Sequence, residues 1–202
     1  MTDSDNIAVL KILSNASAVI TQGEVLQLSA ANNIDTSMDE YIEIITSKTA
    51  ALFAAACEVG PVLSNASPEH AKAMHNYGLN LGIAFQIADD ALDYSSDRET
   101  LGKTIGDDFR EGKMTAPILL TLDQCDDTER AFWQRTIADH NQNDEDLKTA
   151  QAILEKYDSV NRSLKLAEQY CEKAQNALNK IPQSPLRALL HDLVPYTIFR
   201  KN

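Results

Sequence analysis

The run PEHAKAMHNYGLNLGIAFQIADDALDY, residues 68–94, predicts one long amphipathic helix with three aspartates near its C-terminal end. Ser67 suits the N-cap, and Pro68 suits the first helical position. Apolar residues recur every three or four positions, as one buried helix face requires; they are Met74, Tyr77, Leu81, Phe85, Ala88 and Leu92. We therefore expect a helix from residue 68 to about residue 94.

The sequence on both sides of this helix is also helical in pattern. Apolar spacing predicts a helix over 7–28. Ser37 and Glu40 form a capping-box pattern that opens a second helix, which should end at Gly60-Pro61. Residues 95–113 are rich in charge and glycine, which predicts a long ordered loop. Further helices are expected over about 115–122, 128–140, 145–157, 159–181 and 185–197.

Composition indicates a single all-α domain over residues 1–202. The chain has 202 residues, only seven glycines and six prolines, and no convincing strand alternation, repeat or low-complexity linker. Cys57, Cys125 and Cys171 are too widely spaced to suggest a disulfide framework or a zinc site. His70, His75, His140 and His191 show no metal-site or triad spacing, and Trp133 is expected to pack in the core.

Charge excludes some classes of partner. Thirty Asp and Glu against 18 Lys and Arg give a net charge of −12, which repels nucleic acids and anionic membrane surfaces. No apolar run approaches the roughly 20 residues that cross a bilayer, and no signal peptide opens the chain. We expect a cytoplasmic protein with no nucleic-acid partner and no stable membrane insertion.

The aspartates at the end of the 68–94 helix form the one cluster that indicates chemistry. Asp89 and Asp93 share a helix face, and Asp90 lies about 100° round from them. Carboxylates in the last turns of a helix are disfavoured by its dipole, so they need cations nearby. Their hard oxygen atoms suit Mg²⁺, which takes one or two carboxylates and completes its shell with water or phosphate oxygens.

Positive charge lies where a diphosphate would need it. Lys103 and Lys113 follow the aspartates, and Lys48 stands beside Thr49, whose hydroxyl can donate a hydrogen bond. The triplet alone also fits a solvated helix end with ordinary surface lysines around it. Gln86 upstream, and the Gly-Lys and Gly-Asp-Asp spacing downstream, favour the metal–diphosphate interpretation.

The motifs together resemble the polyprenyl (trans-isoprenyl diphosphate) synthase family, long-chain octaprenyl or decaprenyl type. FQIADDALDY (85–94) looks like the family's second aspartate-rich motif, and LGKTIGDDFREGK (101–113) looks like the segment after it. Upstream, YIEIITSKTA (41–50) and GEVLQL (23–28) are similar to the two preceding helices. The resemblance implies a helical bundle of the isoprenoid synthase type, which would here lack its N-terminal helices.

The resemblance also implies a role for each site residue. Asp89 would bind Mg²⁺ directly, and Asp90 and Asp93 would bind it directly or through water. Lys48, Lys103 and Lys113 would neutralise the diphosphate of the allylic substrate, while Thr49 and Gln86 would lie near the developing carbocation. The allylic diphosphate would ionise, the double bond of isopentenyl diphosphate would attack, and a proton would be lost.

One departure from the family pattern is large. The first aspartate-rich motif and the basic residues that bind isopentenyl diphosphate would precede Met1. We therefore expect impaired elongation by the isolated chain, exposed apolar helix faces, and a homodimer or a partner subunit that covers them. Two alternatives remain: a non-catalytic subunit or helical interaction module of a prenyltransferase complex, and an enzyme that is active with a separately encoded N-terminal partner.

Overall fold

The computed structural model of the chain describes residues 5–94 and 106–198, and every regular element in these two ranges is helical. The all-α prediction is confirmed. The elements are α1 (Ile7–Ala30), α2 (Met38–Ile45), a π-helical turn η2 (Thr46–Ala50), α3 (Ala51–Leu63), α4 (Pro68–Leu92), α5 (Asp107–Arg110), α6 (Ala116–Leu122), α7 (Asp127–Trp133), a π-helical turn η4 (Gln134–Ala138), α8 (Asp146–Lys156), α9 (Ser159–Ala177), a 3₁₀ turn η5 (Leu178–Lys180) and α10 (Pro185–Ile198).

The predicted helix starts are confirmed by their caps. Glu40 accepts a hydrogen bond from the Ser37 backbone at 2.7 Å, while the Glu40 N–H donates to the Ser37 hydroxyl at 3.2 Å, which completes the capping box before α2. The Ser67 hydroxyl likewise accepts from the His70 N–H at the start of α4. Local hydrogen bonding therefore sets these boundaries.

The predicted end at Gly60-Pro61 is wrong, because α3 continues to Leu63. Pro61 removes only one amide donor this close to the helix end. The carbonyls of Gly60 and Pro61 are satisfied from beyond the helix, by the N–H groups of Ser64 at 3.0 Å and Ala66 at 2.9 Å. Helix α3 can therefore continue past the proline with these two carbonyls paired.

The predicted loop over 95–113 is wrong in part. Residues 107–110 form the short helix α5, while residues 95–105 lie outside the described ranges. Gly106 precedes α5 in the left-handed conformation, with φ 78°. A four-residue helix is too short to produce an apolar periodicity, so the sequence pattern did not predict it.

Contacts along the described chain separate two compact units. Unit 1 comprises residues 1–25, 43–86 and 167–202, and unit 2 comprises 26–42 and 87–166. Several helices contribute to both units, since the divisions fall inside α1, α2, α4 and α9. The single domain over 1–202 stays a prediction.

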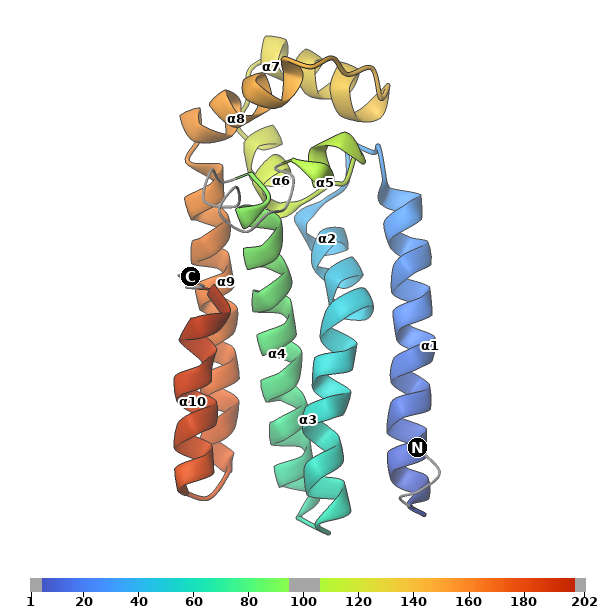
Figure 1. The fold of residues 1–202 in the computed structure, drawn as a ribbon, viewed down its shortest axis with the longest axis vertical. Helices are drawn as coiled ribbons and strands as arrows, with labels where there is room; N and C mark the ends of the chain where they lie inside the picture. The colour runs from blue at the N-terminus through green and yellow to red at the C-terminus, as the bar shows by residue number, and fades with distance from the viewer. Residues whose placement is uncertain (1–4, 95–105, 199–202) are drawn as a thin grey trace. The chain divides into compact units, whose positions relative to one another are not determined.

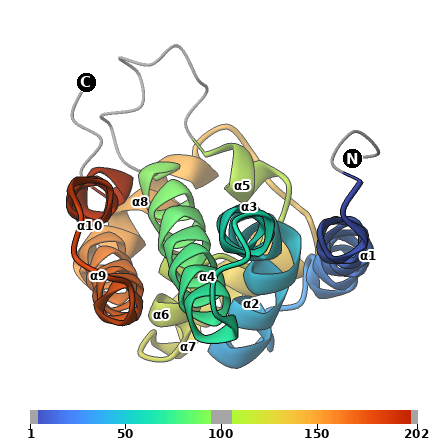
Figure 2. The same ribbon diagram turned by 90° about the horizontal axis from the view of Figure 1, so that it is seen from below.

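Unit 1 packs its helices closely. In Figures 1 and 2, α3 lies beside α4, and α9 lies beside α10. A Cβ atom at Gly78 of α4 would lie 2.3 Å from the Phe53 carbonyl oxygen of α3, and one at Gly23 of α1 would lie 2.4 Å from the Lys48 nitrogen. These two glycines let the helix backbones approach each other.

The last helix, α10, is held to both of its neighbours in unit 1. The Tyr77 hydroxyl of α4 donates to the Leu190 carbonyl at 2.9 Å. Pro195 lies inside α10 and supplies no N–H to the His191 carbonyl, four residues earlier; the Gln175 side-chain amide of α9 donates to that carbonyl at 3.3 Å. A side chain therefore replaces the missing backbone bond.

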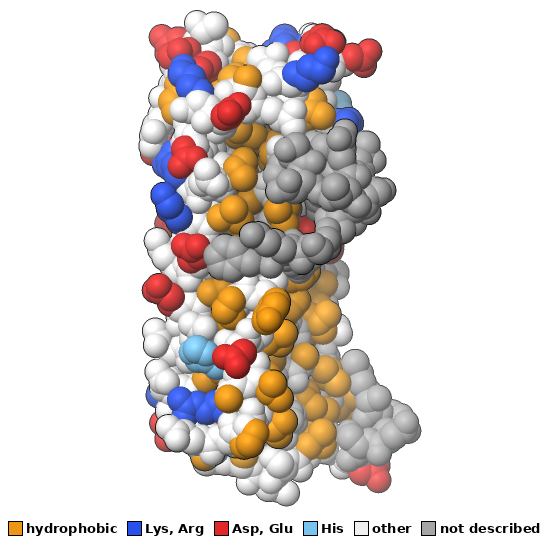
Figure 3. All heavy atoms as spheres, turned by 60° about the vertical axis from the view of Figure 1, so that its left-hand side comes forward, with side chains coloured by type: hydrophobic (Ala, Val, Ile, Leu, Met, Phe, Trp, Pro, Cys, Tyr) orange, Lys and Arg blue, Asp and Glu red, His pale blue; other side chains and the backbone are white. Residues whose placement is uncertain are grey.

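One face of α10 is apolar and exposed. Leu186, Leu189, Leu193 and Tyr196 are 73%, 64%, 51% and 70% exposed. We call these four residues the α10 stripe. Their spacing of three, four and three residues places them on one helix face, and Figure 3 shows hydrophobic side chains gathered on the side that carries α10. Such a stripe is typical of a helix that another helix covers.

Unit 2 has its own aromatic core. Trp133 is fully buried, with the rings of Phe132 and Phe109 edge-on at 5.2 and 6.3 Å between centroids. The prediction that Trp133 packs in the core is confirmed. Phe109 belongs to α5, so this core anchors the short helix that follows the candidate site.

Candidate functional site

The aspartate cluster in unit 2 is buried at the end of α4. Asp90 is 6% exposed and Asp93 is 1% exposed, while Asp89 is half-buried. Burying a carboxylate is costly unless hydrogen bonds or opposite charges compensate it. The contacts of each carboxylate therefore show what the site is built to hold.

Asp90 is held by a tyrosine from α2. The Tyr41 hydroxyl donates to Asp90 Oδ2 at 2.7 Å, and Tyr41 is 2% exposed. Burial, and then the nearby Asp90 charge, hold the pKa of Tyr41 well above its ordinary value. Tyr41 therefore keeps its proton and acts as a neutral donor.

Asp93 is held by the backbone before and within α5. The Asp108 N–H donates to Asp93 Oδ2 at 3.0 Å, and the Gly106 N–H donates to the Asp93 carbonyl at 3.0 Å. A Cβ atom at Gly106 would lie 2.3 Å from Leu147, and the positive φ also favours glycine here. Gly106 thus allows the backbone to turn back onto Asp93.

Lys113 brings positive charge to the same group in unit 2. Its ammonium bonds Asp108 at 2.9 Å and Glu111 at 2.7 Å. Burial lowers the pKa of Lys113, but the hydrogen bonds to Glu111 and Asp108 outweigh it and raise that pKa above the ordinary value. Lys113 is therefore charged. It is linked to Asp93 through Asp108, whose carboxylate bonds Lys113 and whose backbone N–H bonds Asp93.

Among the buried hydroxyls of unit 2, those of Tyr94 and Thr115 make no hydrogen bond of ordinary geometry to the residues that the structure describes. Burial, and then the charge of Asp108, raise the pKa of Tyr94 well above its ordinary value. The Tyr94 hydroxyl therefore belongs to the polar surroundings of the aspartates, and the sequence pattern had not singled out either hydroxyl.

Unit 1 holds three further predicted site residues, Lys48, Thr49 and Gln86. Lys48 and Thr49 lie in the π turn η2, a kind of turn that is frequent at functional sites. The Thr49 hydroxyl donates to Gln86 Oε1 at 2.8 Å, so the structure brings these two predicted residues together. The Lys48 ammonium lies 3.1 Å from a Glu24 carboxylate oxygen. Lys103 lies outside the described residues.

The donors fit a magnesium ion that is shared with a phosphate ligand. In the described ranges, no three carboxylate, imidazole or thiolate side chains converge to hold a metal by themselves. Mg²⁺ commonly binds through only one or two carboxylates together with water and substrate phosphates. The half-buried Asp89 and its two fixed neighbours are oxygen donors of that kind.

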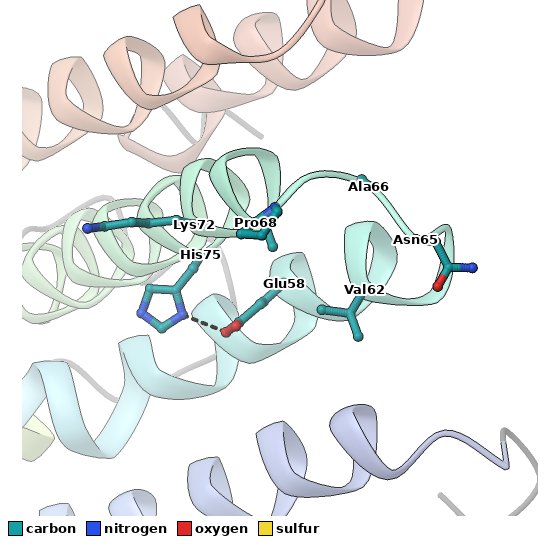
Figure 4. A pocket seen from close by; sticks show the side chains of 8 residues that line it. Glu58, Val62, Asn65, Ala66, Pro68, Lys72 and His75 are labelled. Carbon is teal, nitrogen blue, oxygen red and sulfur yellow. Dashed lines mark hydrogen bonds and ion pairs between the residues drawn. The ribbon is translucent and has the colours of Figure 1, made fainter.

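A separate pocket of about 540 Å³ opens in unit 1 between α3 and α4 (Figure 4). Glu58 and His75 point toward each other there, with 2.8 Å between a carboxylate oxygen and Nδ1. None of the predicted site residues lines it. His75 of α4 thus has a carboxylate partner on the preceding helix, α3, which the sequence spacing had not indicated.

Sequence reasoning missed Tyr41 and Asp108 as partners of the aspartates. Tyr41 is 49 residues from Asp90, and no local pattern links the two. Asp108 contributes its backbone N–H to Asp93, so its residue type carries no signal for that role. Only the folded chain brings these groups together.

Comparisons with known proteins agree with the family resemblance of the sequence motifs. The polyprenyl synthetase family model matches residues 1–154. The chain is 37% identical over 200 residues to octaprenyl diphosphate synthase of Escherichia coli K12. This alignment covers 99% of the chain and 62% of that protein. The chain is 36% identical over 200 residues to an all-trans-nonaprenyl-diphosphate synthase (geranyl-diphosphate specific) of Rhodobacter capsulatus, covering 99% and 61%.

Solved structures give the same result. A decaprenyl diphosphate synthase from Rhodobacter capsulatus superposes with a TM-score of 0.93 at 46% identity, covering 100% of this chain and 62% of that one. A polyprenyl synthase from Caulobacter crescentus, complexed with calcium and isoprenyl diphosphate, superposes with a TM-score of 0.95 at 42% identity and the same coverage. The chain spans about three-fifths of these relatives' length, and its predicted fold type is confirmed.

Proposed function

Because the chain belongs to the polyprenyl synthetase family, we propose that it serves the Mg²⁺-dependent condensation of isopentenyl diphosphate with an allylic diphosphate. The observation that supports this most strongly is the buried pair Asp90 and Asp93, each fixed by a hydrogen bond from another segment of unit 2. Buried carboxylates held in this way are suited to binding a cation. The related polyprenyl synthase from Caulobacter crescentus was solved in complex with a divalent cation, calcium, and with isoprenyl diphosphate.

In this proposal, Asp89 binds Mg²⁺ directly, and Asp90 and Asp93 bind it directly or through water. When bound, Mg²⁺ supplies electrostatic stabilisation of the negative charge that develops on the leaving diphosphate. The aspartates orient the ion, and their buried setting strengthens the attraction, because less water screens it.

The other site residues act on the substrate. Lys48, Lys103 and Lys113 neutralise the diphosphate, and the charged state of Lys113 is favoured by its contacts with Glu111 and Asp108. Thr49 holds the Gln86 side chain by the 2.8 Å hydrogen bond, so that a polar group with a fixed orientation can face the developing carbocation.

In this proposal the isolated chain has less elongation activity than its full-length relatives. The chain covers 62% of the octaprenyl diphosphate synthase it matches, and the printed sequence holds one DDxxD motif. We expect it to bind the allylic diphosphate with Mg²⁺ but to elongate poorly unless a second copy or a partner subunit is present. No helix in the described ranges has the length and apolarity needed to span a membrane; a cytoplasmic location is part of the proposal.

A non-catalytic subunit of a prenyltransferase complex is the second candidate. The exposed α10 stripe favours it, because a partner helix would cover these four apolar residues. This candidate and the first one differ in whether the chain itself transfers prenyl groups.

The test is a pair of measurements on the purified chain. Calorimetry with geranyl diphosphate should show binding that requires Mg²⁺, and Asp89→Ala should abolish it. Incorporation of labelled isopentenyl diphosphate then separates the candidates: product, even when it forms slowly, identifies a catalytic chain, and binding without any product identifies a non-catalytic subunit. Equal binding by wild type and Asp89→Ala would contradict the assigned site.

A further inference from the structure

We propose that Tyr41 is a positioning residue, which sets the metal affinity of the site by holding the Asp90 carboxylate in one orientation. The inference rests on the proposed function, because it concerns how the aspartates bind Mg²⁺. Tyr41 lies in α2, 49 residues before Asp90, and its hydroxyl lies 2.7 Å from Asp90 Oδ2. The two residues are 2% and 6% exposed, so the bond forms away from bulk water.

Asp90 needs such a restraint because of where it stands. It occupies the last turn of α4, where the helix carbonyls make the local field negative and disfavour a carboxylate. A buried carboxylate without a donor would turn toward any available polar group or toward water. The Tyr41 hydroxyl removes that freedom by fixing one of the two oxygens.

A tyrosine is suited to this task because it is a neutral donor. Lysine or arginine at the same place would bring a positive charge that competes with the metal ion for the carboxylate. The phenol hydroxyl donates a hydrogen bond and leaves the full negative charge on Asp90. The bond therefore orients the carboxylate without neutralising it.

The neighbouring carboxylate is restrained by a different kind of donor. Asp93 accepts from the Asp108 backbone N–H, a group that every replacement except proline retains. The Tyr41 restraint on Asp90 acts through a side-chain hydroxyl instead. Tyr41→Phe deletes that oxygen and retains the ring, so the variant isolates the orienting bond.

The choice of metal provides a readout that a general loss of structure would not give. Mg²⁺ requires nearly ideal octahedral geometry, whereas Ca²⁺ accepts irregular oxygen arrangements. Loss of a hydrogen bond that orients a metal ligand costs roughly 10–100-fold in metal affinity. Tyr41→Phe should therefore weaken Mg²⁺ binding by about tenfold and weaken Ca²⁺ binding far less.

The experiment measures geranyl diphosphate binding by calorimetry while Mg²⁺ or Ca²⁺ is titrated, for wild type and Tyr41→Phe. Tyr77→Phe is the matched control: Tyr77 is 1% exposed, and its hydroxyl donates one part-buried hydrogen bond to the Leu190 carbonyl and not to a carboxylate. We expect the Mg²⁺ midpoint to shift in Tyr41→Phe and to stay unchanged in Tyr77→Phe.

A second comparison guards against a folding defect in Tyr41→Phe. In an Asp90→Asn background the added Tyr41→Phe change should leave the Mg²⁺ midpoint unchanged, because the carboxylate through which Tyr41 acts is no longer present. Equal midpoints for wild type and Tyr41→Phe, equal losses for Mg²⁺ and Ca²⁺, or additive losses in the double variant would each overturn the inference. If wild type itself showed no metal-dependent binding, the proposed function would fail instead.

Discussion

Single charged residues in this chain are buried where hydrogen bonds stabilise the charge. Asp146 is 4% exposed, and the Arg135 guanidinium bonds both of its oxygens, at 2.9 and 2.7 Å. The hydrogen bonds from Arg135 come first among the causes that lower the pKa of Asp146; burial opposes them, and the Asn143 backbone N–H adds to them. This carboxylate is thus stabilised in its charged form.

Asp146→Asn should lower Tm in a manner that depends on pH. A carboxyl whose pKa is lowered by folding contributes stability above its unfolded pKa of about 3.9, and that contribution is lost as pH falls through the folded pKa. We expect the largest Tm difference from wild type near pH 7 and a shrinking difference below about pH 4. Thermal melts followed by circular dichroism from pH 3 to 7 measure it.

Asp35→Asn is the control for this series. Asp35 also pairs with an arginine, Arg130, at 2.9 Å, but its side chain is 79% exposed. Exposed pairs contribute little to stability, so its Tm should match wild type at every pH. A difference between Asp146→Asn and wild type that does not change with pH would contradict the role given to the Asp146 charge.

At the scale of elements, glycines set how closely the helices of unit 1 can pack. A Cβ atom at Gly78 would lie 2.3 Å from the Phe53 carbonyl oxygen and 2.7 Å from its carbon. These atoms belong to the backbone of α3, which cannot rotate away as a flexible side chain would. The approach of α3 to α4 therefore depends on this position.

Gly78→Ala should destabilise the fold by about 1–3 kcal/mol, the usual cost of overpacking. Gly60→Ala is the matched control, because a Cβ atom there meets nothing within 4 Å; alanine in a helix is favoured over glycine, so we expect no loss of stability. Urea unfolding of both variants makes the comparison. If both variants lost stability equally, the close approach of α3 and α4 would not be the cause.

The sequence predicted elements best where the signal was local. Ser37 and Ser67 identified helix starts because a cap is formed within three residues. The end of α3 was misplaced because Ser64 and Ala66, beyond Pro61, supply the amides that satisfy its carbonyls. The helix α5 was missed because its stability comes from a core partner, Trp133, and not from a repeating pattern.

The candidate site shows the same difference between local sequence signals and long-range contacts. The aspartate triplet, Thr49 with Gln86, and Lys113 could be named from motifs and a resemblance, and the structure joins Thr49 to Gln86. Tyr41 could not be named, since its role depends on a contact 49 residues away. The side chains that bind a ligand leave a sequence signal, whereas the groups that orient those side chains are found only in the fold.

For the whole molecule, the α10 stripe is the feature with the largest consequence for assembly. Four apolar side chains more than half exposed on one helix face favour association with another surface. This agrees with the proposal of a homodimer or a partner subunit.

Leu189→Glu combined with Leu193→Glu should reduce self-association of the purified chain. A charge in the middle of the stripe must be desolvated when the face is covered, and that cost opposes assembly. Sedimentation velocity over a range of concentrations measures the effect, with Leu63→Glu, on an exposed position of α3, as the control. If the wild-type chain stayed monomeric at every concentration, the homodimer would be excluded, and a partner subunit would remain as the proposed cover of the α10 stripe.

The proline inside α10 has a consequence for local opening of that helix. Pro195 has no exchangeable amide, and the backbone bond it would have made is replaced by a side chain of α9. The residues after it are therefore joined to the rest of α10 by fewer hydrogen bonds than an uninterrupted helix would provide. In deuterium exchange, the amides of residues 196–198 should lose protection earlier than those of 189–194, so that the last turn opens as a separate unit.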